Sequence, residues 1–365
     1  MRRTVTLALS AAIAASTLAA LLPASQAAAL TTASVPTSWR LAYQAHLKQA
    51  NSIFSVSSVS RTDAWAIGTI GIGTTGYAVH FDGHRWRMVA VPSRFAPARL
   101  MTGTAANIWL AGIRYSKTGH TGSPEQLRWT GASWQVMPEP PIQDGSVVLA
   151  TGNKGAWAFA GSAWTKGEGW HVAAAYWDGQ RWSHRPIPSV GNAPAFASAP
   201  DGSAWVAGTA SKEFQPTDGN LAIYHWTGSG WSRLTFPRIT YVAGTEQISV
   251  LSASNIWISA AQMVGSKLVN AAWHWAHGKL QRLPRAEVGV GGPVAADSAN
   301  SAWFGVLAYW TGTKWVYPVR NRCVLAANSE GVSPVPGTHS AWGADFCVSS
   351  SQPYQGEIEI SGPTP

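Results

Sequence analysis

The chain has few charged residues for its length: Asp, Glu, Lys and Arg make up 12% of 365 residues. No long segment shows the charged, amphipathic pattern of a surface helix, which argues against a helical protein. The formal net charge is +9, but the basic residues are dispersed and form no run. Because a nucleic-acid-binding protein needs a clustered basic patch, we expect no nucleic-acid partner.

Motifs of the common catalytic and metal sites are also missing. The sequence contains no His-Glu-x-x-His, no Cys-x-x-Cys, no Gly-rich phosphate loop and no Gly-x-Ser-x-Gly. These patterns place metal ligands, phosphate-binding backbone or a serine nucleophile. We therefore predict no cofactor, no metal site and no assigned catalytic residue.

A long apolar run occurs only at the N-terminus. Two arginines precede an apolar stretch over residues 4–22, and small residues follow up to Ala29. This order is typical of a secretory signal peptide, here residues 1–29 with cleavage near Ala27 or Ala29, and the small residues argue against a retained anchor. We expect a secreted, extracellular protein without a membrane span, whose single folded domain covers residues 30–365.

Tryptophans recur along the rest of the chain at intervals of 39 to 52 residues. The anchors are Trp65, Trp109, Trp157, Trp205, Trp257, Trp303 and Trp342. A period of 40–50 residues suits one four-stranded blade of a β-propeller. Blades pack only on their neighbours, so such a fold stays one domain at this length.

A second signature follows the first six anchors: an aromatic residue, then x-Gly-x-x and usually Trp, as in Trp177-Asp178-Gly179-Gln180-Arg181-Trp182. It predicts a hairpin between the third and fourth strands, with glycine at a positive φ and Asp-Gly as a type I′ pair. The aromatic residues are either packing between blades, which the repetition favours, or platforms for sugar rings.

The seventh repeat ends without a fourth strand. Residues 357–362 give its third strand, and residues 37–43 resemble the fourth strand of other repeats. We therefore predict an all-β, seven-bladed β-propeller of four-stranded antiparallel blades, closed by the N-terminal strand, which protects the sheet edges. Cys323 and Cys347, expected on the first and second strands of this blade around a turn at 331–337, predict a disulfide in an oxidising compartment.

Irregular loops join the blades and the second and third strands, at one face of the ring, for example Tyr115–Gln126 and Thr165–His171. Variable loops on a rigid scaffold commonly carry function, although such residues also suit a solvated rim. The candidate ligand-binding residues are Arg114, Tyr115, Glu125, Trp164, Glu168, Trp170, Tyr241 and Arg322.

Two further sets of polar residues call for an interpretation. His80, His225 and His274 each precede a third-strand aromatic, too far apart to share one metal, so we expect them to pack. Asp345 replaces a small residue of the second strand, and a buried carboxylate there needs a partner such as Arg320 or Arg322.

The repeat resembles, over nearly the whole chain after residue 29, those of secreted bacterial β-propellers of the kelch, galactose-oxidase-like or sialidase-like kind. The segment 177–182 echoes the sialidase Asp-box and is similar to the Trp-Asp-Gly repeat of fucose-binding propeller lectins. The chain departs from them in lacking the paired kelch glycines and the recurrent Arg and Glu of those lectins.

These observations lead to a hypothesis of a non-catalytic binding or scaffold propeller, whose loops recognise an extracellular polysaccharide or a surface protein. The alternatives are a carbohydrate-active hydrolase or lyase, with loop carboxylates such as Glu125 and Glu168 at the channel mouth, and an assembly protein without a ligand.

Overall fold

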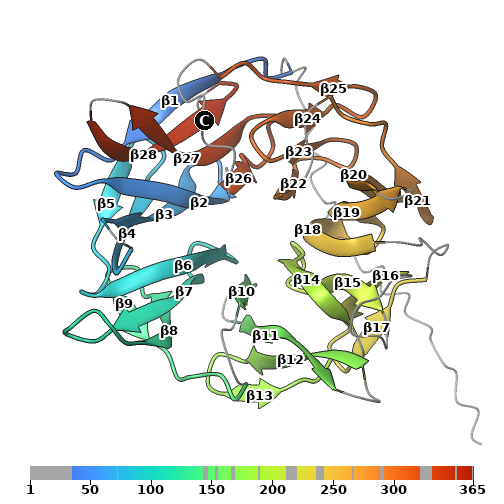
Figure 1. Ribbon diagram of the computed structural model, residues 1–365, viewed down its shortest axis with the longest axis horizontal. Helices are drawn as coiled ribbons and strands as arrows, with labels where there is room; N and C mark the ends of the chain where they lie inside the picture. The colour runs from blue at the N-terminus through green and yellow to red at the C-terminus, as the bar shows by residue number, and fades with distance from the viewer. Residues whose placement is uncertain are drawn as a thin grey trace, which may run out of the picture. The chain divides into compact units, whose positions relative to one another are not determined.

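The computed structural model describes most of the chain beyond its N-terminus. The described residues are 35–71, 73–142, 147–152, 155–165, 169–187, 190–210, 220–235, 242–264, 267–287, 292–320, 331–349, 352–363 and 365. They form seven four-stranded antiparallel sheets arranged as a ring of blades (Figure 1). The predicted all-β, seven-bladed propeller is confirmed. No helix in the described part of the chain has the length and hydrophobicity that a membrane-spanning segment requires.

Blades 1 to 6 are meanders whose strands follow one another from the first strand, nearest the ring centre, to the fourth at the outside (Figure 1). Blade 1 comprises β2 (Asn51–Ser60), β3 (Asp63–Ile70), β4 (Thr75–Phe81) and β5 (Trp86–Val89). Blade 2 comprises β6 (Phe95–Thr102), β7 (Ile108–Tyr115), β8 (Gly122–Trp129) and β9 (Trp134–Val136). Blade 3 comprises β10 (Val147–Thr151), β11 (Gly155–Thr165), β12 (Gly169–Trp177) and β13 (Trp182–His184).

The next three blades repeat this order with different strand lengths. Blade 4 comprises β14 (Gly191–Ser198), β15 (Ala204–Ala210), β16 (Asn220–Trp226) and β17 (Trp231–Arg233). Blade 5 comprises β18 (Val242–Ser252), β19 (Asn255–Val264), β20 (Lys267–Ala276) and β21 (Lys279–Arg282). Blade 6 comprises β22 (Val294–Ala296), β23 (Ala302–Phe304), β24 (Ala308–Trp310) and β25 (Trp315–Val316), and its strands are only two or three residues long.

Blade 7 combines both ends of the sequence. It contains β26 (Gly331–Pro334), β27 (Ala341–Ser349) and β28 (Gln352–Ser361), and its fourth strand is β1 (Trp39–Gln44). Strand β1 pairs antiparallel with β28, from Trp39 opposite Ser361 to Gln44 opposite Glu357. The predicted closure by the N-terminal strand is confirmed. It gives β28 a hydrogen-bonding partner at the edge where the chain would otherwise end unpaired.

The seven anchor tryptophans lie between blades and are at most 2% exposed. Each one packs against the outer hairpin of the following blade. The ring of Trp65 lies 5.3 Å from that of Trp129 in blade 2, and the ring of Trp303 lies 5.2 Å from that of Trp39 in blade 7. The inter-blade interpretation of these residues is therefore confirmed, and the same contact that joins neighbouring blades also seals the closure.

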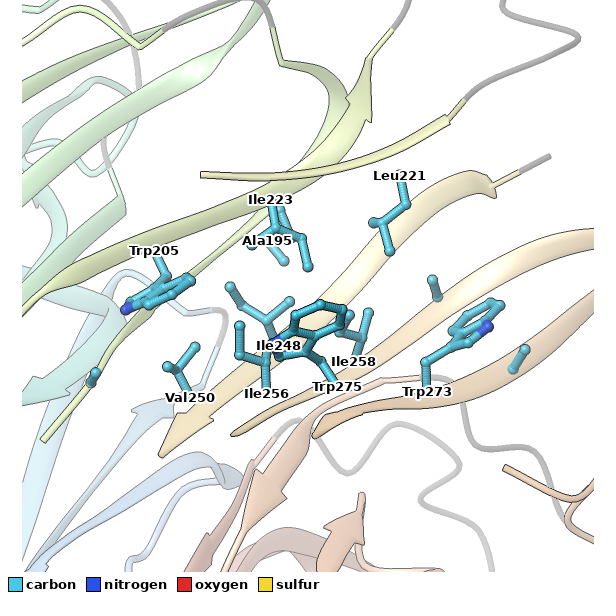
Figure 2. Packing of buried hydrophobic residues seen from close by; sticks show 14 residues of the cluster. Ala195, Trp205, Leu221, Ile223, Ile248, Val250, Ile256, Ile258, Trp273 and Trp275 are labelled. Carbon is cyan, nitrogen blue, oxygen red and sulfur yellow. The ribbon is translucent and has the colours of Figure 1, made fainter. Parts of the chain in front are cut away.

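The interface between blades 4 and 5 illustrates this packing (Figure 2). Trp205 and Ile223 of blade 4 point toward side chains of blade 5 such as Ile248, Val250 and Ile256, and all five belong to one buried cluster. β-branched residues stand out from both sheet faces and fill the space between neighbouring blades. The core is thus a series of inter-blade layers.

The hairpins between third and fourth strands partly follow the expected turn chemistry. Gly83 and its five counterparts have positive φ, as predicted. Asp82 does not have a positive φ, because the loop between Phe81 and its strand partner Trp86 has four residues. The Asp82 carboxylate instead accepts hydrogen bonds from the N–H groups of His84 and Arg85. The type I′ prediction for Asp-Gly is therefore wrong, and a two-residue loop with positive φ at both positions occurs only at His277-Gly278 among the described hairpins.

Candidate functional site

The two ends of the ring differ in how they are built. Antiparallel strands place the connections between blades and the hairpins between second and third strands at one end, called here the loop end. The turns between first and second strands, such as 199–203, and between third and fourth strands, such as 227–230, lie at the other, called here the turn end. All eight candidate ligand-binding residues are expected on the irregular loops of the loop end.

Arg114, Tyr115 and Glu125 lie in strands at the loop end of blade 2. Strand β7 continues to Tyr115 and β8 begins at Gly122, so the expected loop Tyr115–Gln126 shrinks to residues 116–121. The hairpin between β11 and β12 is shortened likewise, to residues 166–168. The loop placement was wrong because these strands extend beyond the inter-blade core, where polar side chains are accommodated in a strand as readily as in a loop.

Arg114 and Glu125 hold each other in a fixed geometry. The Arg114 Nε donates to Glu125 Oε2 over 3.2 Å, Nη2 donates to Oε1, and Nη1 donates to the carbonyl of Ser93. The guanidinium also lies 5.7 Å from the ring centre of Phe95. A bidentate pair of this kind is directional and strong. Both oxygens of Glu125 are therefore engaged, which weakens its candidacy as an acid or base of hydrolysis.

The remaining candidate residues are placed in part. Trp164 on β11 and Trp170 on β12 are direct cross-strand partners at the loop end of blade 3. Glu168, Tyr241 and Arg322 lie outside the described residues. The structure thus brings Arg114, Tyr115 and Glu125 together on one hairpin, with the Trp164–Trp170 pair on the equivalent hairpin of the next blade.

Asp345 is buried in blade 7, and the predicted partner Arg320 is present. Arg320 Nη2 donates to Asp345 Oδ2 over 2.6 Å, and Nε donates to Glu359 Oε2 over 2.8 Å. The side chains of Arg320 and the two acids are 9% and 2% exposed. Burial disfavours the charged guanidinium, but the charges of Glu359 and Asp345 outweigh it and raise the pKa of Arg320. The group stabilises the closing blade as an ion-paired brace.

The cysteine prediction concerns the same blade. Cys347 lies on β27, the second strand, as expected, whereas Cys323 lies outside the described residues. The first strand of the blade is β26, Gly331–Pro334, so the turn expected at 331–337 begins only after Pro334. A disulfide between Cys323 and Cys347 stays a prediction.

The three histidines pack as expected, each against the anchor tryptophan of its own blade. Ring centres are 4.3 Å apart for His80 and Trp65, and 3.7 Å apart for His274 and Trp257. His225 stacks on Trp205 in the same manner, at 4.7 Å. Burial lowers the pKa of His274 to about 4, with a smaller effect from His277. These rings serve packing between the third strand and the anchor tryptophan.

An open pocket of about 560 Å³ lies at the turn end over blade 4. Its walls come from two turns of blade 4, from blade 3 and from the first turn of blade 5, and include Tyr176, Asp201, Ser203, His225 and Trp226. Its volume is in the range of small-molecule sites, which combine aromatic rings with a few directional polar groups. The sequence did not indicate this pocket, because the irregular loops that suggest a site lie at the opposite end of the ring. The detectable signal was the residue two before each anchor, which is Asp63 or Asn255 in blades 1 and 5 but Ser203 in blade 4.

The class that the fold defines is the seven-bladed β-propeller, and several solved structures are similar to it. The β-propeller domain of the Trilobed protease from Pyrococcus furiosus, which has an open velcro topology, is 10% identical; the match covers 87% of this chain and 94% of that chain, with a TM-score of 0.58. YCF48 from Cyanidioschyzon merolae is 14% identical, with 89% and 98% covered and a TM-score of 0.50.

A third similar structure is Pyrococcus horikoshii acylaminoacyl peptidase, 8% identical, with 83% of this chain and 50% of that chain covered and a TM-score of 0.52. The chain matches no protein-family model and no curated protein. At these identities the likeness shows the fold alone. In contrast to the open topology of the Pyrococcus furiosus domain, β1 closes the last blade here.

Proposed function

We propose that the chain is a secreted, non-catalytic β-propeller that binds an extracellular polysaccharide through the loop end of blades 2 and 3. The observation that carries this proposal is the placement of aromatic and polar candidate residues on equivalent hairpins of adjacent blades. Tyr115 and the Arg114–Glu125 pair lie at the end of one hairpin, and Trp164 is opposite Trp170 in the strand register of the other. Aromatic residues beside fixed hydrogen-bonding groups suit a ligand rich in hydroxyl groups.

The described carboxylates support binding rather than hydrolysis. Glu125 is held by Arg114, and Asp345 and Glu359 are bound by Arg320 inside blade 7. A glycosidase needs two carboxyl groups that face the scissile bond, one of them able to deliver a proton. Carboxylates whose oxygens are engaged by arginine, or buried within a blade, are poorly suited to either role.

Binding is tested by co-sedimentation of the protein with insoluble polysaccharides and bacterial cell walls, with product analysis in the same tubes. Trp164→Ala and Trp170→Ala should each weaken sedimentation at least about tenfold, the loss expected for a buried aromatic contact. Leu268→Ala is the matched control, since Leu268 is 59% exposed on the corresponding hairpin of blade 5. Binding to no polysaccharide, binding unchanged in both variants, or release of cleaved product would each overturn the proposal.

Secretion is tested by expressing the full chain and determining the N-terminus of the protein in the culture medium. A mature N-terminus between residues 28 and 30 is expected from the small-residue stretch that ends at Ala29. Retention of the whole protein in the cells with residues 1–29 intact is the contrary result.

A further inference from the structure

The pocket over blade 4 stands out when the same third-strand position is compared around the ring. The residue paired with the anchor tryptophan is His80, Tyr176, His225, His274 and Tyr309 in blades 1, 3, 4, 5 and 6. In blades 1, 5 and 6 the histidine Nε2 or tyrosine hydroxyl at this position forms a hydrogen bond within the protein. In blades 3 and 4, whose residues Tyr176 and His225 line the pocket, that polar atom has no hydrogen-bond partner among the described residues.

The bound members of this row have clear partners. His80 Nε2 lies 2.9 Å from Asp63 Oδ1, and His274 Nε2 lies 3.3 Å from Asn255 Oδ1. The Tyr309 hydroxyl donates to Asp297 Oδ2 over 2.8 Å. Each acceptor belongs to the turn between first and second strands, or to the second strand just after it, beside the anchor tryptophan. The fold therefore provides an internal acceptor at the turn end of these three blades.

Among the described residues, blades 3 and 4 supply no such acceptor. The position of Asp63 and Asn255 is Gly155 in blade 3, which has no side chain to accept a bond, and Ser203 in blade 4. The Ser203 hydroxyl is already engaged, since it donates to Asp201 Oδ1 over 2.6 Å and accepts from the Trp205 indole over 2.9 Å. Within the described part of the chain, neither the Tyr176 hydroxyl nor the His225 ring forms a hydrogen bond, and His225 Nδ1 is buried without a partner.

The Tyr176 hydroxyl and His225 Nε2 have no hydrogen-bond partner among the described residues and are not buried, so a molecule in the pocket can form hydrogen bonds with them. Because His225 Nδ1 is buried, Nε2 is the atom that a bound molecule can reach, and it is also the atom that His80 and His274 use. Asp201 adds a carboxylate at the same pocket. A ligand that binds the Tyr176 hydroxyl, His225 Nε2 and the Asp201 carboxylate therefore needs groups that both donate and accept hydrogen bonds.

The rings around the pocket restrict the ligand further. The Trp205 face is covered by His225, and the guanidinium of Arg185 lies 5.6 Å from the ring centre of Trp226. An aromatic cage for a quaternary ammonium needs open ring faces, so this arrangement disfavours such a cation. The exposed carboxylate of Asp201 disfavours an anion by like-charge repulsion. An uncharged ring that carries several hydroxyl groups meets both conditions.

We propose that the pocket over blade 4 binds one residue of a neutral sugar, with His225 Nε2, the Tyr176 hydroxyl and Asp201 bound to its hydroxyl groups. The site lies at the opposite end of the ring from the Trp164–Trp170 hairpin and does not depend on it. A protein with both sites would hold a chain at the loop end and a single sugar residue at the turn end.

The experiment is a titration of the full mature protein by calorimetry, with NMR of the histidine side chains. The probes are neutral hexoses, N-acetylhexosamines, glucuronic acid and choline. Saturable binding of at least one neutral sugar with a shift of the His225 signals is expected, and weak or no binding of glucuronic acid and choline. Absence of binding by every neutral sugar, or tighter binding of choline or glucuronic acid, would overturn the proposal.

Three variants separate ligand contact from folding. His225→Ala should weaken sugar binding about tenfold, and Tyr176→Phe, which removes only a hydroxyl, about threefold, as expected for single hydrogen bonds. His274→Ala is the matched control, because His274 stacks on its tryptophan in the same way but is bound to Asn255 in another blade. Equal loss of binding in His274→Ala and His225→Ala, or unchanged binding in both pocket variants, would contradict the assignment. Loss at the turn end with intact polysaccharide sedimentation distinguishes this site from the loop end.

Discussion

Blades 1, 5 and 6 and blades 3 and 4 use the same strand position in two different ways. In the first group a histidine or tyrosine ring packs against the anchor tryptophan and is hydrogen-bonded to a nearby acid or amide, as His80 is to Asp63. In the second group the ring contact is retained, as for His225 on Trp205, but the hydrogen-bond partner is absent from the described residues. Packing against the tryptophan therefore serves the fold in every one of these blades, whereas hydrogen bonding varies with the acceptor that the turn before the tryptophan, or the start of the second strand, supplies.

The difference shows how a repeat fold can acquire a site without new elements. A histidine or tyrosine ring that is hydrogen-bonded within the protein stabilises its blade, whereas the same ring without an acceptor can form a hydrogen bond with a ligand. In blade 3 this position is Gly155, and in blade 4 it is Ser203, whose hydroxyl is already engaged. Blade 6 also has a serine there, Ser301, but its turn supplies Asp297, which accepts from the Tyr309 hydroxyl. Blade 7 lies at the other extreme, with Arg320 and two acids satisfied within the closing blade.

The largest expected effect is that of Arg320→Ala, which tests how much the buried ion pairs of the closing blade contribute to stability. The variant leaves Asp345 and Glu359 buried beside each other without the guanidinium, and breaking a buried pair in this way costs about 3–5 kcal/mol. Urea unfolding of the purified variant measures the loss, with Arg181→Ala as control because that side chain is 85% exposed. Arg320→Lys, which keeps a charge, should lose less. A loss in Arg320→Ala no larger than in the control would show that the brace contributes nothing to closure.

The comparison between blades is tested directly by two identical substitutions. Tyr309→Phe removes a hydroxyl that is bound to Asp297 and lies 2.8 Å from His339 Nδ1, and should lower the free energy of unfolding by about 1–2 kcal/mol. Tyr176→Phe removes a hydroxyl without a partner in the described part of the chain, and should stay within about 0.5 kcal/mol of the wild type.

Both values come from the same urea titration, in the absence of sugar. Addition of a bound neutral sugar should stabilise the wild type more than Tyr176→Phe, because a ligand stabilises the folded state according to its affinity. Equal destabilisation by the two substitutions would mean that the Tyr176 hydroxyl forms a hydrogen bond within the protein.

Much of this fold is predictable from the sequence because the blades repeat one physical requirement. The anchor spacing gave seven blades, and the strand-like residues 37–43 gave the closure, since both follow from packing that every blade must repeat. Asp345 was expected to need a partner, and Arg320 provides it. The extension of β7 to Tyr115 was not predicted, because its polar end has no buried face that would reveal a strand.

The turn-end pocket could not be predicted for a different reason. Tyr176, Ser203 and His225 come from two blades, and the pocket also includes a turn of blade 5, so only the closed ring brings them together. Sequence analysis treated His225 as one of three equivalent packing histidines, which is correct for its ring but not for its hydrogen bonding. The distinction depends on whether a particular hydroxyl, that of Ser203, is already engaged, and this requires coordinates.

The smallest expected effect is on the pH dependence of the free energy of unfolding, to which two histidines contribute with opposite sign. A hydrogen bond to Asp297 and its charge raise the pKa of His339 against the opposing effect of burial, whereas burial lowers the pKa of His274 to about 4. His339 therefore contributes stability below the unfolded pKa of about 6.5 and loses it as the pH rises through its higher folded value. His274 opposes folding as the pH falls below about 6.5 toward 4, because the unfolded chain then binds a proton that the folded state excludes.

The measurement is urea unfolding of His339→Gln and His274→Gln, each compared with the wild type at pH 8 and pH 5. His339→Gln should lose more stability relative to the wild type at pH 5 than at pH 8, and His274→Gln should lose less at pH 5 than at pH 8. The differences should be smaller than those above, because both rings are partly exposed and solvent screens their charges. A shift of the same sign in both variants would show that the pairing of His339 with Asp297 does not distinguish it from a histidine that is only stacked and buried.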